Sequence, residues 1–318
     1  MKIVDLDGFA ANPGDISWDA FKQLGDFVVY DNSNKEQVIE RAKDADILLV
    51  NKIEITEDII EQLPKLKYIG ELATGYNNID ISAARNKGII VTNIPAYSTD
   101  SVAQMVFAHL LNVATHVDYY ASETRKGVWS SKDTFCYWDK PLMELAGKTL
   151  GIIGLGNIGF KVAKIGHTLG MDISAYTSKE SGDLPEWIRK TTLEGLYSTA
   201  NVITLHCPLT PDNSKMINEK AFEQMHQGTI LINTGRGGLV DEKAVFTALK
   251  NGKLKAYCAD VLTQEPPQND LPLLKQPNAF ITPHIAWATI EARKRLLEIA
   301  VENIKAFIQG KPQNVVNK

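Results

Sequence analysis

Three side chains in the second half of the chain are of the types that bind anions and transfer protons. Arg236 lies among glycines, Glu265 precedes two prolines, and His284 follows Thr282-Pro283. An arginine can clamp a carboxylate through two parallel hydrogen bonds and polarise the neighbouring carbonyl group. A histidine can protonate the carbonyl oxygen as a hydride arrives, and a carboxylate on its other ring nitrogen fixes the tautomer.

Taken singly, Arg236 and Glu265 are explained about equally well as a capping or surface arginine and as surface charge. Their positions favour a shared site. Arg236, Glu265 and His284 follow the predicted strands 229–233, 256–259 and 279–281, respectively. Ligands of open parallel sheets bind beyond the carboxyl ends of the strands. Trp287 lies close enough to His284 to form a wall of the substrate pocket.

A glycine fingerprint in the middle of the chain predicts a dinucleotide site. Gly154-x-Gly156-x-x-Gly159 follows the apolar run 150–153 and opens a helical segment, 158–169. In this arrangement Gly154 makes the turn, Gly156 lets the backbone approach a pyrophosphate, and Gly159 allows close packing of helix on strand. The glycines are much more specific in this strand–helix context than alone.

Both halves of the chain alternate apolar runs with amphipathic stretches, which predicts two parallel α/β sheets. In the first hundred residues, strands are expected at 2–6, 27–30, 46–50, 68–72 and 89–92. In the second half, six strands separated by helices fit a Rossmann sheet: 150–153, 172–176, 202–206, 229–233, 256–259 and 279–281. We expect one long helix over 99–125 and an amphipathic C-terminal helix over 289–309.

Composition excludes several classes of protein. The 318 residues suggest two domains, with 44% hydrophobic and 23% charged residues and a net charge of −4, so nothing favours nucleic acid or an anionic membrane. Cys136, Cys207 and Cys258 are scattered and form no metal-binding pattern. Neither a signal peptide nor a membrane span is indicated, so we expect a cytoplasmic protein without a metal site.

The first lobe contributes a candidate anion site. Ala73, Thr74 and Gly75 follow a predicted strand, and the backbone N–H groups of such a loop can bind a substrate carboxylate. An ordinary strand-to-helix turn explains the loop about as well. In the second half, His206 ends a strand before Cys207-Pro208 and is expected to line the cofactor cleft without reacting.

Together these stretches resemble the D-isomer-specific 2-hydroxyacid dehydrogenases over nearly the whole chain. The matching segments are 73–80, 151–159, 205–210, 232–241, 259–261 with Glu265-Pro266, and 282–286. The resemblance implies a Rossmann domain inserted into a flavodoxin-like substrate domain: 1–98 substrate domain, 99–287 NAD(P)-binding domain, 288–318 substrate domain. It also implies a homodimer formed through the cofactor domain.

The resemblance assigns roles to matching residues. Arg236, Glu265 and His284 become the catalytic set, and Asp260 the partner of the nicotinamide carboxamide. Substrate contacts are expected from Ala73, Thr74, Gly75, Arg236, His284 and Trp287. Cofactor contacts are expected from Gly154, Gly156, Asn157, Ile158, Gly159, Thr177, Ser178, Lys179, His206, Cys207, Pro208, Thr234, Gly235, Arg236 and Asp260.

The substrate and the cofactor stay open at this level. Residues 135–138 and 284–288 are most similar to glycerate dehydrogenases, which makes hydroxypyruvate and D-glycerate the first expectation. Glyoxylate, D-lactate, another D-2-hydroxy acid, or a dinucleotide-sensing, corepressor-like binding protein are the alternatives. Thr177, Ser178 and Lys179 stand where NAD-specific sites place an acid about 20 positions past the glycines, so the sequence predicts NAD or NADP. Gln104, where many members have glutamate, has no interpretation.

Overall fold

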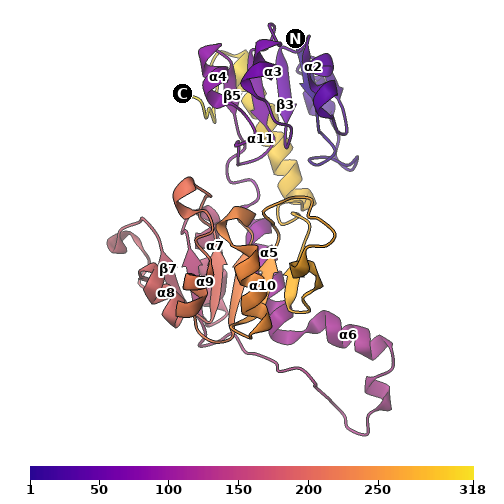
Figure 1. Cartoon of the computed structure of the whole chain (residues 1–318). Helices are drawn as coiled ribbons and strands as arrows, with labels where there is room; N and C mark the ends of the chain where they lie inside the picture. Colours follow the sequence, from indigo (N-terminus) through magenta and orange to yellow (C-terminus); the bar gives the residue numbers. More distant parts are fainter. The chain divides into compact units, whose positions relative to one another are not determined.

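A computed structural model describes all 318 residues, and the chain divides into two compact units. Unit 1 consists of Met1–Ser98 and Trp287–Lys318, and unit 2 is the continuous segment Thr99–Ala286. The chain thus re-enters unit 1 at Trp287, one residue before the boundary expected from the sequence. Each unit is built on a wholly parallel sheet flanked by helices (Figure 1).

Unit 1 has a five-stranded sheet in the order β2-β1-β3-β4-β5, which is the flavodoxin-like order 2-1-3-4-5. Its strands are β1 (Lys2–Asp5), β2 (Asp26–Val29), β3 (Ile47–Val50), β4 (Tyr68–Glu71) and β5 (Ile90–Thr92). Its helices are α1 (Asp19–Lys22), α2 (Lys35–Ala42), α3 (Glu57–Glu61), α4 (Ile81–Asn86) and α11 (Ile290–Ile308).

The alternation of side chains along β3 explains how one strand serves two cores. Ile47 and Leu49 pack in the cluster that contains the buried face of α11, whereas Leu48 and Val50 pack in the cluster with α2, α3 and α4. All four side chains are fully buried. A strand covered on both faces reads as an unbroken apolar run rather than as an alternating one.

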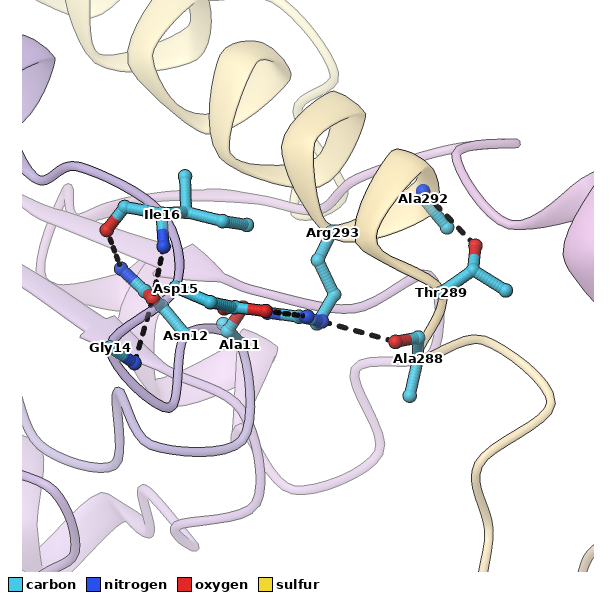
Figure 2. A network of polar contacts seen from close by, with 9 residues as sticks. All are labelled: Ala11, Asn12, Gly14, Asp15, Ile16, Ala288, Thr289, Ala292 and Arg293. Atoms are coloured by element: carbon cyan, nitrogen blue, oxygen red, sulfur yellow. Dashed lines mark hydrogen bonds and ion pairs between the residues drawn. The ribbon is translucent and has the colours of Figure 1, made fainter.

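Arg293 fastens the first turn of α11 to the loop after β1 (Figure 2). Its guanidinium makes a two-pronged ion pair with Asp15, with both N···O distances 2.6 Å, and its Nε donates to the Ala288 carbonyl at 3.1 Å. The Thr289 hydroxyl accepts from the Ala292 N–H and caps the helix. Asp15 and Arg293, which are 278 positions apart, are therefore joined within unit 1.

Unit 2 has a seven-stranded sheet in the order β12-β11-β10-β9-β6-β7-β8, which contains the Rossmann order 3-2-1-4-5-6 with β12 added at one edge. Its strands are β6 (Thr149–Ile153), β7 (Asp172–Tyr176), β8 (Ile188–Lys190), β9 (Val202–Leu205), β10 (Thr229–Asn233), β11 (Leu254–Ala259) and β12 (Ala279–Ile281). Its α-helices are α5 (Thr99–Thr115), α6 (Val117–Arg125), α7 (Asn157–Thr168), α8 (Leu193–Thr199), α9 (Glu219–Gln224) and α10 (Glu242–Lys250). Five short 3-10 helices lie at Trp129–Ser131, Ser181–Asp183, Pro211–Asn213, Gly237–Leu239 and Pro272–Lys275.

Two expectations about unit 2 are wrong. The single long helix over 99–125 is two helices, because His116 takes a left-handed conformation with φ 52° and separates α5 from α6. α5 buries nine side chains, whereas α6 buries none, so the apolar face that supports the helix ends with α5. The sheet also has a seventh strand, β8, whose three residues give too short a pattern to be recognised.

Two absences complete the description of the structure. No helix combines the length and the apolar character required to cross a lipid bilayer. No group of three or more histidine, cysteine, aspartate or glutamate side chains is placed to hold a metal ion.

Candidate active site

The polar residues singled out in unit 2 lie at one edge of its sheet. Arg236, Asp260 and His284 follow the carboxyl ends of β10, β11 and β12. These three strands are parallel neighbours in the sheet, so the segments that follow them meet at the same edge. The structure therefore brings these residues to one rim of unit 2, as the strand pattern implied.

His284 and Glu265 form a direct pair. The distance from His284 Nδ1 to Glu265 Oε2 is 2.6 Å, and the side chains are 25% and 33% exposed. Glu265 Oε1 accepts a hydrogen bond from the Leu262 N–H at 2.9 Å, which fixes the carboxylate. With Nδ1 directed at a carboxylate, the opposite ring nitrogen is the one that can exchange a proton with a substrate.

Asp260 anchors the turn that carries His284. Its side chain is 1% exposed and accepts hydrogen bonds from Thr282 Oγ1 (2.6 Å) and from the N–H groups of Ile285 (2.9 Å) and Ala286 (2.7 Å). His284 itself adopts φ 55°, a conformation that such bonds on both sides can hold. Asp260 thus sets the orientation of the imidazole, a role that the sequence did not indicate.

Two residues of α5 contact the turn that carries His284. The Ser101 hydroxyl donates to the Ala286 carbonyl, and His109 Nε2 lies 3.4 Å from Thr282 Oγ1. His109 is buried, and desolvation lowers its pKa, so it stays neutral near pH 7. His109 is therefore a packed residue that supports the turn.

The arginine segment is held by Asn233, the last residue of β10. Asn233 Nδ2 donates to the Arg236 carbonyl at 2.9 Å, and its Oδ1 accepts from the Gly235 N–H at 3.0 Å. The Arg236 side chain is exposed and its Nη1 donates to the Gly235 carbonyl. The guanidinium forms no ion pair within the chain, so its fork is available to an anion.

Gly237 joins the arginine segment to the glutamate segment. A Cβ atom at this position would lie 2.0 Å from the Leu262 carbonyl carbon and 2.3 Å from the Thr263 nitrogen. Only a residue without a side chain permits this backbone contact. The glycines of Gly235-Arg236-Gly237-Gly238 are visible in the sequence, but their contact with the Leu262–Thr263 backbone depends on the fold.

The glycine fingerprint forms a cradle that fits a pyrophosphate. Gly154 has φ +94°, and the space around a Cβ at Gly156 is open to beyond 4 Å. The backbone N–H groups of Gly156, Asn157 and Ile158 have no acceptor within the chain at the start of α7. Free N–H groups at a helix N-terminus bind anions, so these residues fit a dinucleotide.

The fingerprint packs closely on the segment after β9. A Cβ at Gly154 would lie 2.6 Å from the Cys207 nitrogen and 2.7 Å from the His206 carbonyl carbon, so the backbone of these two residues lies against the glycine turn. Burial lowers the pKa of His206 to about 3, and its Nε2 pairs with Thr204 Oγ1 at 2.9 Å, so the ring is neutral. Nearby in the sheet, Thr234 Oγ1 is buried without a hydrogen-bond partner, as expected of a group that a ligand completes.

The segment after β7 carries no acid in the place of the ribose-binding residue. Thr177 Oγ1 accepts from the Lys179 N–H at 3.2 Å, and the Lys179 Nζ lies 5.9 Å from the centre of the Phe160 ring. Glu180 pairs with Lys190 at 3.6 Å. Ser178 and Lys179 lie in a bend, and with Thr177 this segment offers two hydroxyl groups and an ammonium group.

The remaining candidates belong to unit 1. The backbone N–H groups of Ala73, Thr74 and Gly75 have no acceptor within the chain. The Ala73 and Thr74 carbonyls, by contrast, accept from Ile94 N (2.9 Å) and Asn93 Nδ2 (2.7 Å). Trp287 packs edge-on against Tyr97, with ring centres 6.4 Å apart. Three consecutive free N–H groups suit an anion.

Comparisons with known proteins identify the family to which the chain is similar. Residues 107–286 match the family model described as "D-isomer specific 2-hydroxyacid dehydrogenase, NAD binding domain". The chain is 44% identical, over 100% of both sequences, to a hydroxypyruvate reductase of Blautia hydrogenotrophica. It is 41% identical to a glycerate dehydrogenase of Methylorubrum extorquens, over 88% of each sequence.

Two solved structures share the fold over nearly the whole chain. An acyclic imino acid reductase in complex with NADPH and D-Arg is 31% identical, with a TM-score of 0.86 and coverage of 99% of this chain and 100% of the other. A D-lactate dehydrogenase of Aquifex aeolicus complexed with NAD and lactic acid is also 31% identical, with a TM-score of 0.84 and coverage of 98% and 96%.

Proposed function

We propose that this chain, a member of the D-isomer specific 2-hydroxyacid dehydrogenase family, reduces hydroxypyruvate to D-glycerate. It is an NAD- or NADP-dependent enzyme. The observation that carries the chemistry is the His284–Glu265 pair at the same sheet edge as Arg236. The choice of substrate is supported by the two relatives whose names refer to hydroxypyruvate and glycerate.

Each residue of the site then has a defined task. The Arg236 guanidinium binds the substrate carboxylate through two N–H groups and polarises the neighbouring carbonyl group. The reduced nicotinamide, when bound, supplies the hydride to the carbonyl carbon. His284 gives a proton from its outer nitrogen to the carbonyl oxygen, which becomes the hydroxyl group. Glu265 holds the imidazole through Nδ1 and fixes the orientation of the ring.

The cofactor and the substrate use backbone groups as well. We assign the pyrophosphate to the N–H groups of Gly156, Asn157 and Ile158, and the substrate carboxylate to those of Ala73, Thr74 and Gly75. Asp260 already accepts hydrogen bonds from the turn that carries His284. We assign it to the nicotinamide carboxamide as an additional role. Thr177, Ser178 and Lys179 are compatible with either the ribose hydroxyls of NAD or the 2′-phosphate of NADP.

We also propose that the protein is a cytoplasmic homodimer that assembles through unit 2. In that unit, α6 and the segment after it project from the sheet (Figure 1). Large apolar side chains are exposed there, with Phe135 90%, Trp138 68% and Val117 65% exposed. Large apolar side chains that are exposed on one projecting segment favour an interface. Light scattering on the purified protein tests the dimer, and a monomer at micromolar concentration would exclude it.

Steady-state assays of hydroxypyruvate, glyoxylate and pyruvate with both NADH and NADPH test the function. We expect the highest kcat/KM with hydroxypyruvate. His284→Ala should abolish turnover while the affinity for reduced cofactor, followed by fluorescence, stays within about twofold. Arg236→Lys should mainly lower kcat/KM for the substrate, because lysine has no fork. Tight cofactor binding with no turnover of any 2-oxo acid would instead favour a dinucleotide sensor.

A further inference from the structure

A buried carboxyl group lies beneath the loop Leu72–Asn78 of unit 1. Glu71 is the last residue of β4, is fully buried, and pairs in register with Val50 at the end of β3. Its Oε2 accepts a hydrogen bond from Asn78 Nδ2 at 2.9 Å, while its Oε1 is buried without a partner. The carboxyl group therefore contacts the far end of a loop that begins at the next residue.

Both ends of this loop are held by side-chain amides. Asn51 Nδ2 donates to the Leu72 carbonyl at 2.9 Å. Asn78 Nδ2 also donates to the Ile53 carbonyl at 3.0 Å, and the Asn78 carbonyl accepts from the Ile55 N–H at 2.8 Å. Between these fixed ends lie the three N–H groups of Ala73, Thr74 and Gly75 that have no partner in the chain. Through Asn78, Glu71 is the acidic side chain that contacts the loop itself, and we call these amide contacts at the two ends of the loop the clamp.

The surroundings of Glu71 favour its neutral form. Burial raises its pKa to about 9, and the nearby Asp7 carboxylate acts in the same direction. The Asn78 hydrogen bond and the Lys52 ammonium group oppose this shift. Asp7 accepts from the N–H groups of Asn51, Lys52 and Ile53, and Asp5 at the end of β1 is itself fully buried. If Glu71 were ionised beside Asp5 and Asp7, its carboxylate would have no counter-ion at hydrogen-bond distance.

We propose that Glu71 is a positioning residue for substrate binding: through Asn78 it fixes the loop whose N–H groups bind the substrate carboxylate. This inference rests on the proposed function, which assigns Ala73, Thr74 and Gly75 to that carboxylate. An ordered loop presents its N–H groups without an entropic cost on binding, so loss of the clamp affects substrate affinity before it affects chemistry. Cofactor binding, which uses unit 2, is untouched.

The experiment compares Glu71→Ala with Glu71→Gln in the full-length enzyme. Glu71→Ala should raise KM for hydroxypyruvate at least tenfold, change kcat less than threefold and leave the affinity for reduced cofactor unchanged. Glu71→Gln keeps the shape and an acceptor for Asn78, so its KM at pH 7 should stay within about twofold of the wild type. As the pH rises toward 9, KM should increase more in the wild type than in Glu71→Gln, because only the former can acquire the charge.

Further measurements separate positioning from general damage. In Glu71→Ala, hydrogen exchange at residues 73–78 should accelerate without global unfolding. Asp5→Asn is the matched control, because Asp5 is equally buried but contacts the Asp7 N–H rather than the loop. An unchanged KM in Glu71→Ala, or an equal rise in Asp5→Asn, would overturn the inference while leaving the proposed function intact. A wild-type protein that reduces no 2-oxo acid would overturn the proposed function itself.

Discussion

The contact at Gly237 yields the sharpest prediction for the active site. A Cβ there would lie 2.0 Å from the Leu262 carbonyl carbon, whereas carbon atoms in favourable contact are about 3.5–4.0 Å apart. Gly237→Ala must therefore separate the Arg236 segment from the Leu262–Glu265 segment by about 1 Å or more. Both neighbours of the clash are backbone, so no side-chain rotation relieves it.

The expected loss can be estimated from this displacement. A misplacement of about 1 Å can cost about 100-fold in rate, which corresponds to about 2.7 kcal/mol of transition-state stabilisation. We expect kcat/KM for hydroxypyruvate to fall by about that factor in Gly237→Ala. Overpacking should also lower the free energy of unfolding by about 1–3 kcal/mol. Thermal unfolding and steady-state kinetics on the same preparation measure the two effects.

Gly238→Ala is the matched control at the neighbouring position. Its Cβ would meet Leu209 Cδ2 at 2.8 Å, the end of a flexible and partly exposed side chain that can rotate away. Activity within about threefold of the wild type is expected. If Gly237→Ala were as active as Gly238→Ala, the argument that close backbone packing aligns Arg236 with the His284–Glu265 pair would be refuted.

Two further substitutions address the cofactor and the stability of unit 1. Thr177→Asp should raise KM for NADPH at least tenfold and affect NADH much less, because a carboxylate beside Lys179 repels a 2′-phosphate; equal effects on both cofactors would place the ribose elsewhere. Arg293→Met should lower Tm most near neutral pH, since the Arg293 hydrogen bonds lower the pKa of Asp15 and that stabilisation is lost as the pH falls below about 4. A Tm difference that stays constant down to pH 2 would remove the ion pair as its cause.

Much of the architecture followed from local patterns. The five strands of unit 1, six of the seven strands of unit 2 and the C-terminal helix were each evident from runs of apolar residues with the right period. The exceptions have physical reasons. β8 is too short to show a period, and the break at His116 depends on α6 having no buried face, which a local hydrophobic pattern does not reveal.

The sequence by itself determined which chemistry is present: a glycine fingerprint between strand and helix, and an arginine, a glutamate and a histidine after three successive strands. These signals are local, since they depend on residue type and on spacing within one β–α step. Only the tertiary structure decided what orients them. Asp260 under the His284 turn, Gly237 against Leu262 and Glu71 beneath the loop Leu72–Asn78 all act through contacts between segments. Such contacts exist only once parallel strands have set their carboxyl ends side by side, and no spacing along the chain encodes them.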